Sequence, residues 1–157
     1  MSKQGIRGFY QLTETIKNEL LQNSEIVTTV TTGDITDIDL SKQTIFPLAH
    51  IIVNSVTAQE QVLSFNITVM AMDIVNVEKR ATTDIFVGNT NEQDILNTQL
   101  AVINTLVMKL RLGNLHRSKY QLVGDPTCEP FYERFENQLA GWACTMDIDI
   151  HNDINLC

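Results

Sequence analysis

Hydrophobic side chains recur at intervals of three and four residues in two parts of the chain, and this spacing predicts two amphipathic α-helices. The first covers residues 8–22, and its apolar face consists of Phe9, Leu12, Ile16 and Leu20. The second covers residues 91–112 and carries a longer apolar stripe. Thr90 and Gln93 have the spacing of a capping box at its start, and Gly113 follows its end.

Between these helices, apolar and polar side chains alternate in the pattern of a half-buried β-strand. The longest such region predicts a β-hairpin over residues 46–77 that turns at residues 58–61. Its second arm, residues 62–75, would extend about 46 Å at ~3.3 Å per residue. A compact domain of this length has a diameter of roughly 40 Å. We therefore expect the hairpin to protrude or to pair with a neighbouring subunit.

Three further strands are predicted, at residues 26–32, 119–123 and 142–150, because β-branched residues or strict alternation mark each of them. Residues 127–137 read as a packed loop or strand, and the polar connection at residues 78–88 as a mobile segment. The predicted order is α-β-β-β-α-β-β. It indicates a single α+β domain, residues 1–157, in which two amphipathic helices pack on an antiparallel or mixed sheet with a long protruding hairpin.

Composition narrows the functional classes. The chain carries 11 basic and 19 acidic residues, a net charge of −8, which opposes the wrapping of nucleic acid. We expect no signal peptide and no membrane span, because no apolar run reaches the required length. Three cysteines without a CxxC pair predict reduced thiols and synthesis in a cytoplasm.

No catalytic, cofactor or metal site is predicted. The aspartates cluster at Asp34, Asp37 and Asp39 and again at Asp147, Asp149 and Asp153, but neither group has the spacing of a calcium loop. Solvated carboxylates are the simpler interpretation. His50 is expected to be a satisfied core or interface residue, and Asp73, inside an apolar run, to occupy an edge or to pair with Arg80. A small cytoplasmic enzyme or ligand-binding domain that uses acidic residues remains the alternative.

Short segments along nearly the whole chain carry a resemblance to a known family. They are FYQL at 9–12, GDI at 33–35, KQTIFPLAH at 42–50, MAMDIV at 70–75, LNTQL at 96–100, EPF at 129–131, ERFEN at 133–137 and AGW at 140–142. These segments resemble tail-terminator or neck-ring proteins of tailed bacteriophages, with those of crAss-like and related marine phages as the nearest match.

The resemblance implies a structural virion protein and not an enzyme. Its copies would form a sixfold or twelvefold ring at the head–tail junction, assembled in the host cytoplasm. The expected partners are other copies of the chain, the portal or connector, and other neck-ring and tail proteins. DNA would pass through the lumen of the ring without specific binding, and no membrane would be involved.

Two sets of site residues follow from these expectations. The subunit interface is predicted on the hairpin arms and on the aromatic segment near residue 131, at Phe46, Val53, Ile67, Met70, Phe131, Tyr132, Arg134 and Phe135. The acidic wall of the lumen is predicted at Asp34, Asp37, Asp39, Asp147 and Asp149.

Overall fold

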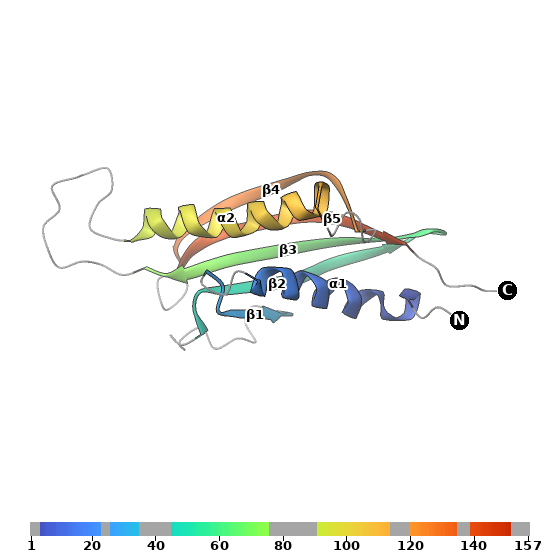
Figure 1. Cartoon of the computed structure of the whole chain (residues 1–157), viewed down its shortest axis with the longest axis horizontal. Helices are drawn as coiled ribbons and strands as arrows, with labels where there is room; N and C mark the ends of the chain where they lie inside the picture. The colour runs from blue at the N-terminus through green and yellow to red at the C-terminus, as the bar shows by residue number, and fades with distance from the viewer. Residues whose placement is uncertain are drawn as a thin grey trace, which may run out of the picture.

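A computed structural model of the chain describes residues 4–22, 26–34, 45–75, 91–113, 120–134 and 139–151 (Figure 1). The helices are α1 (Gln4–Leu21) and α2 (Glu92–Arg111). The strands are β1 (Thr29–Thr32), β2 (Leu48–Ala58), β3 (Val62–Ile74), β4 (Gln121–Arg134) and β5 (Leu139–His151). This order confirms the predicted α+β fold.

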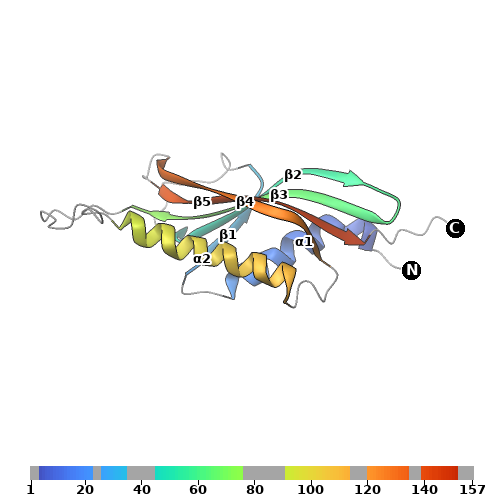
Figure 2. The ribbon, with the colours of Figure 1, turned by 90° about the horizontal axis from the view of Figure 1, so that it is seen from above.

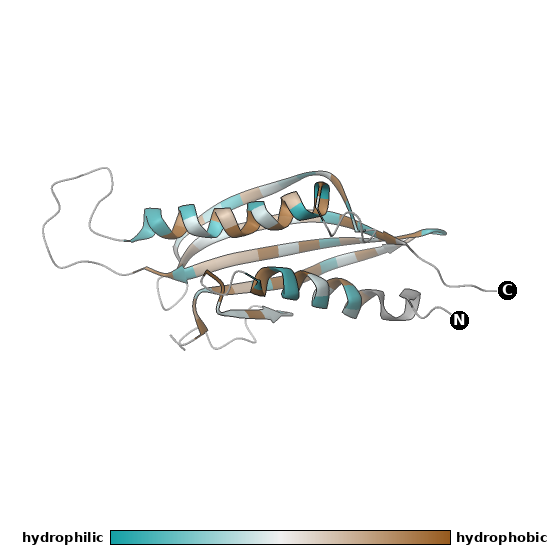
Figure 3. Ribbon diagram, viewed as in Figure 1, coloured by the Kyte–Doolittle hydropathy of each residue, from teal (hydrophilic) through white to brown (hydrophobic). Residues whose placement is uncertain are grey.

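The strands form one five-stranded sheet in the order β1-β2-β3-β5-β4. β1 runs parallel to β2, and the other three pairs are antiparallel, so the sheet is mixed. Both helices lie on the same face of the sheet (Figure 2). The hairpin of β2 and β3 turns at residues 59–61, where Gln59 N donates to Val62 O at 2.9 Å. Its tip extends past the neighbouring strands and is hydrophilic (Figures 2 and 3).

The main core fills the space between the helices and the sheet. Buried side chains from one face of each element meet there, among them Leu12 and Ile16 of α1, Ile103 and Leu106 of α2, and Phe65 and Ile67 of β3. Removing these apolar surfaces from water is the principal driving force for the fold. Trp142 Nε1 of β5 donates to Leu96 O of α2 at 2.7 Å, which connects the sheet to the helix layer. Lys109 Nζ of α2 pairs with Glu19 Oε2 of α1 at 2.8 Å, which connects the two helices.

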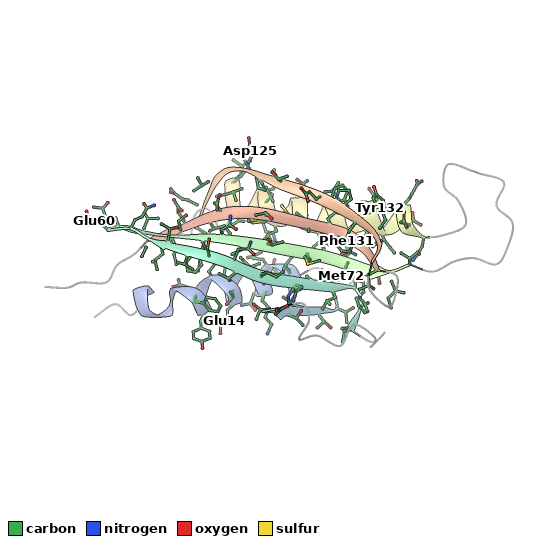
Figure 4. All side chains as sticks on the ribbon, turned by 180° about the vertical axis from the view of Figure 1, so that it is seen from behind. Glu14, Glu60, Met72, Asp125, Phe131 and Tyr132 are labelled. Carbon is green, nitrogen blue, oxygen red and sulfur yellow. The ribbon has the colours of Figure 1, made fainter. Side chains whose placement is uncertain are left out.

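A second apolar cluster lies on the opposite face of the sheet, at the end away from the hairpin tip. It consists of Phe46, Leu48, Met72, Phe131 and Leu139. Figure 4 shows Met72 and Phe131 at this end. Ala71 faces the main core and Met72 faces the second cluster, and both are fully buried. The change from alternating to continuous apolar residues in β3 is therefore explained by burial on both faces.

The structure corrects several predicted details. α1 begins at Gln4, and Phe9 on its predicted apolar face is 45% exposed. β4 is one strand, because residues 124–126 form a bulge between Val123 and Thr127 and do not end the strand. The N-cap of α2 is Asn91, whose side chain donates to Ile74 O at 3.3 Å and does not cap the helix. Thr90 of the predicted capping box and the connection at 78–88 lie outside the described residues.

Gly141 is required by the close approach of β5 to β3. A Cβ atom at this position would collide with the carbonyl oxygen of Ala71 and lie 2.8 Å from Met72 Cα. We expect Gly141→Ala to lower the free energy of unfolding by about 3 kcal/mol or more, since the obstructing atoms belong to the backbone. Urea denaturation measures the change. Thr145→Ser, exposed on the same face of β5, is the control, and equal stability of the two variants would contradict the prediction.

Candidate assembly surfaces

One edge of the sheet is formed by β1 and by the part of β2 that continues past it. β1 pairs only with residues 48–51 of β2, so residues 52–58 have no strand on that side within the described part of the chain. Residues 29–32 and 52–58 contain no charged residue and no proline. We call these two segments the open edge. Natural sheets usually protect an exposed edge with charges or prolines, and this edge has neither.

Backbone groups of the open edge point outward. Thr29 N donates at 3.4 Å to the carbonyl oxygen of Pro47, which precedes β2, and Gly33 N donates at 3.1 Å to Ile51 O of β2. Since alternate residues of a strand direct their backbone groups to opposite sides, Val30 and Thr32 direct theirs away from β2. On β2, Gln59 directs its N–H toward β3, because it donates to Val62 O. The register is continuous from residue 55, so backbone groups alternate between the two sides from there to Gln59. The N–H of Val56, three residues before Gln59, therefore lies on the outer side.

A groove of about 430 Å³ runs between α1 and the open edge. It is lined by Tyr10, Thr13, Glu14 and Lys17 of the helix and by Val30, Thr31, Thr32 and Ile51 of the sheet. The rings of Phe9 and Tyr10 pack edge to face, 5.9 Å between centroids, and Tyr10 is 62% exposed. An edge strand beside a helix groove can accept an added strand, whose backbone pairs with the edge and whose side chains enter the groove.

The opposite edge, formed by β4, is unsuited to strand addition. Pro126 and Pro130 lack an N–H, and Asp125 and Glu129 add exposed charge. The bulge at residues 124–126 is held by Arg111 of α2, which donates to Gly124 O at 3.0 Å and to Asp125 Oδ1 at 2.8 Å. The two edges of the sheet therefore differ in their capacity to pair with another chain.

The sheet face opposite the helices carries a polar network near the hairpin. Asn54 Nδ2 donates to Asn66 Oδ1 and to Thr68 Oγ1, both at 2.9 Å, and Asn66 Nδ2 donates to Asp147 Oδ1 at 2.8 Å. Asp149 lies two residues along β5 on the same face, and its Oδ1 is buried with no hydrogen-bond partner among the described residues. These residues make a continuous polar surface that spans β2, β3 and β5.

The predicted acidic residues are only partly brought together. Asp147 and Asp149 share the polar face, as their alternation in sequence predicted. Asp34 follows β1 and is exposed, with β2 and β3 between it and β5. Asp37 and Asp39 lie outside the described residues.

Three predicted interface residues gather at the second apolar cluster: Phe46 and Phe131 belong to it, and Met70 packs against it. Tyr132, next to Phe131, is 55% exposed (Figure 4). The backbone of Arg134 pairs with Leu139. Phe135 lies outside the described residues.

The interface predicted on the hairpin arms cannot use the backbone of β3. This strand is central, with β2 on one side and β5 on the other. Ile67 is fully buried in the main core, so neither its side chain nor its backbone is available to a neighbour. Val53, its partner across the hairpin, is half-buried against the same core but lies on the open edge. Only the β2 arm offers backbone groups for pairing.

His50 joins β1 to β2 at the open edge and is a satisfied buried residue, as predicted. Its Nδ1 lies 2.8 Å from Thr31 Oγ1 and its Nε2 lies 2.7 Å from Gly33 O. Because a carbonyl only accepts, Nε2 carries the proton and Nδ1 accepts from the threonine hydroxyl. Burial lowers the pKa of His50, and the Gly33 carbonyl and the charge of Asp34 oppose this effect.

The lowered pKa of His50 predicts a pH-dependent stability. Below about pH 6.5 the unfolded chain binds a proton that the folded chain resists, so stability falls as the pH decreases, by at most about 1.4 kcal/mol per pH unit. His50→Gln lacks this titration. Urea denaturation from pH 7.5 to 5 should show a steeper loss for the wild type than for the variant. Carboxylates titrate in both proteins and contribute equally to both curves. Parallel curves of stability against pH would therefore contradict the prediction.

The position of Asp73 in the sheet differs from the prediction. It lies near the end of the central strand β3 and not at an edge, and its Oδ1 accepts a hydrogen bond from Ile74 N at 2.8 Å. Burial raises the pKa of Asp73, and the hydrogen bond from Ile74 opposes that rise. Arg80 lies outside the described residues.

Neither a metal centre nor a membrane span is found in the described ranges. No three His, Cys, Asp or Glu side chains there gather closely enough to hold a metal ion. No described helix is both long and apolar enough to cross a bilayer. A scan against protein-family models and a search of curated proteins match nothing to this chain. The resemblance to phage neck-ring proteins therefore stays a prediction.

Proposed function

We propose that this chain is a structural virion protein whose copies form a ring at the head–tail junction of a tailed bacteriophage. The ring joins the portal or connector to the tail and lets DNA pass. The observation that carries the proposal is the difference between the two sheet edges. A closed ring is built from heterologous contacts, in which two different surfaces of the subunit meet. The open edge with its groove supports one of them.

The second surface in this proposal is the end of β4 that carries Phe131 and Tyr132. Exposed aromatic side chains next to an apolar cluster are typical of interface centres. Tyr132 is exposed beside the second apolar cluster, on the opposite edge of the sheet from the groove. Contacts between this end of one subunit and the open edge of the next leave both surfaces covered when the ring closes.

The polar face of the sheet is proposed to line the lumen. Each subunit carries a net charge of −8, and Asp147 and Asp149 lie on this face. Carboxylates around a channel repel the phosphates of passing DNA, over a distance that salt limits to about 8 Å at physiological ionic strength. Repulsion of this kind favours passage without binding.

The open edge is tested by Val56→Lys. Val56 is 45% exposed, and its N–H points outward, so a lysine there places a charge on the edge that contacts the neighbouring subunit in this proposal. We expect the dissociation constant of the assembly to rise at least about tenfold. Val123→Lys is the matched control, because Val123 is 47% exposed on β4. Native mass spectrometry and sedimentation velocity measure the assembly, and thermal melting checks that both variants fold.

Two results would overturn the proposal. One is an equal effect of both substitutions on assembly. The other is the absence of the chain from purified phage particles, where quantitative mass spectrometry should instead count six or twelve copies against the portal. Absence would favour the alternative, a ligand-binding domain or small enzyme that uses the acidic residues.

The lumen assignment is tested by the double substitution Asp147→Asn and Asp149→Asn in phage. Asp147 is exposed, and the amide oxygen that replaces its carboxylate oxygen can still accept the hydrogen bond from Asn66 Nδ2, so we expect rings and particles to assemble normally. DNA ejection should slow, because the repulsion of phosphates is reduced. Fluorescence of ejected DNA measures the rate. Glu60→Gln at the hairpin turn removes one charge away from this face and is the control. An unchanged rate in the double variant excludes these two carboxylates from the lumen wall.

A further inference from the structure

Two cysteines face each other across the pair of strands at the β4 edge. Cys128 of β4 is directly opposite Cys144 of β5, and Cys128 Sγ donates to Cys144 Sγ at 2.9 Å. Residues directly opposite in antiparallel strands have Cα atoms about 4.5–5.5 Å apart, which lies within the range of about 4.4–6.8 Å found for disulfides. Neither strand would have to move far to bring the two sulfur atoms into a bond.

The two thiols differ in access. Cys144 is fully buried in the main core, and Cys128 is half-buried against it. A reagent from solvent therefore reaches Cys128 first. Burial raises the pKa of Cys144 well above its usual range, and the neighbouring Cys128 adds to this rise. Cys144 is thus inert toward reagents in solvent but adjacent to Cys128, which such reagents can reach.

We propose that Cys128 and Cys144 form a redox modification site that low-molecular-weight disulfides convert to an intramolecular disulfide. The Cys128 thiolate attacks one sulfur of the reagent R–S–S–R, which gives a mixed disulfide and releases R–S⁻. Cys144 then gives up its proton and attacks Cys128 Sγ, which expels the second R–S⁻. Both released thiolates take up protons. The protein loses two hydrogen atoms, and one small disulfide is reduced to two small thiols.

The disulfide would act on a strand whose pairing with its neighbour is interrupted twice. The register between β4 and β5 shifts after Val123 and again after Phe131, and Cys128 lies between these two irregularities. A covalent bond there fixes the middle of β4 to β5. It also closes a short loop in the unfolded chain, and such a crosslink should raise the melting temperature by about 5–10 °C.

The experiment uses the full chain with Cys157→Ser, which leaves Cys128 and Cys144 as its only cysteines. The protein is incubated with oxidised glutathione, alkylated, digested and analysed by mass spectrometry. We expect a crosslinked peptide pair without retained glutathione, formed slowly because of the high pKa of Cys144. We also expect a melting temperature about 5–10 °C higher that returns to its initial value after dithiothreitol.

Two variants in the same background test the order of reaction. Cys144→Ala should keep glutathione on Cys128, since the resolving thiol is gone, and Cys128→Ala should leave Cys144 unmodified. In the protein with both cysteines, glutathione retained on Cys128 beside a free Cys144 would overturn the proposal. Two free thiols after prolonged incubation would overturn it as well. Neither result depends on whether the chain forms rings.

Discussion

The pairing of β3 with β5 is the constraint on which the rest of the structure depends. Every residue of β3 from Val62 to Ile74 has a partner on β5, although more than sixty residues of chain separate the two strands. On its other side β3 forms the hairpin with β2. The position of each helix-facing side chain, and thus the main core, follows from this register, because a shift of one residue would turn the apolar face of β3 toward solvent.

Both helices lie on one face of the sheet, and the other face divides into a polar and an apolar region. Near the hairpin it carries the asparagine, threonine and aspartate network, and at the far end it is apolar, around Met72 and Leu139. The edges also differ, because α1 leaves a groove beside β1 while Arg111 holds the bulge of β4 in place. This single sheet thus presents distinct surfaces in different directions, which heterologous assembly needs and which an isologous dimer does not.

Periodicity predicted the helices and the hairpin well, because each depends on contacts between residues close in sequence. It could not predict the sheet order, which depends on distant pairing. For this reason Ile67 and Met70, three residues apart on one arm, received the same interface assignment although they lie on opposite faces. Gly124, Asp125 and Pro126 are also typical of a turn, and only the register between β4 and β5 shows that they form a bulge. The groove was not predicted, since it requires β1 to lie parallel to β2 beneath α1.

One end of β3 is buried on both faces, and the other end is buried on one face only. The free energy needed to open the sheet locally therefore differs between the two ends. Near Ala71 and Met72, opening the sheet would expose two cores, whereas residues 54–61 at the tip are all exposed. Local opening therefore costs progressively less free energy toward the tip. In the proposed ring, such a subunit would adjust the tip of its hairpin to a neighbour while its doubly covered end keeps its shape, so small errors of fit would be absorbed locally and not passed on from subunit to subunit.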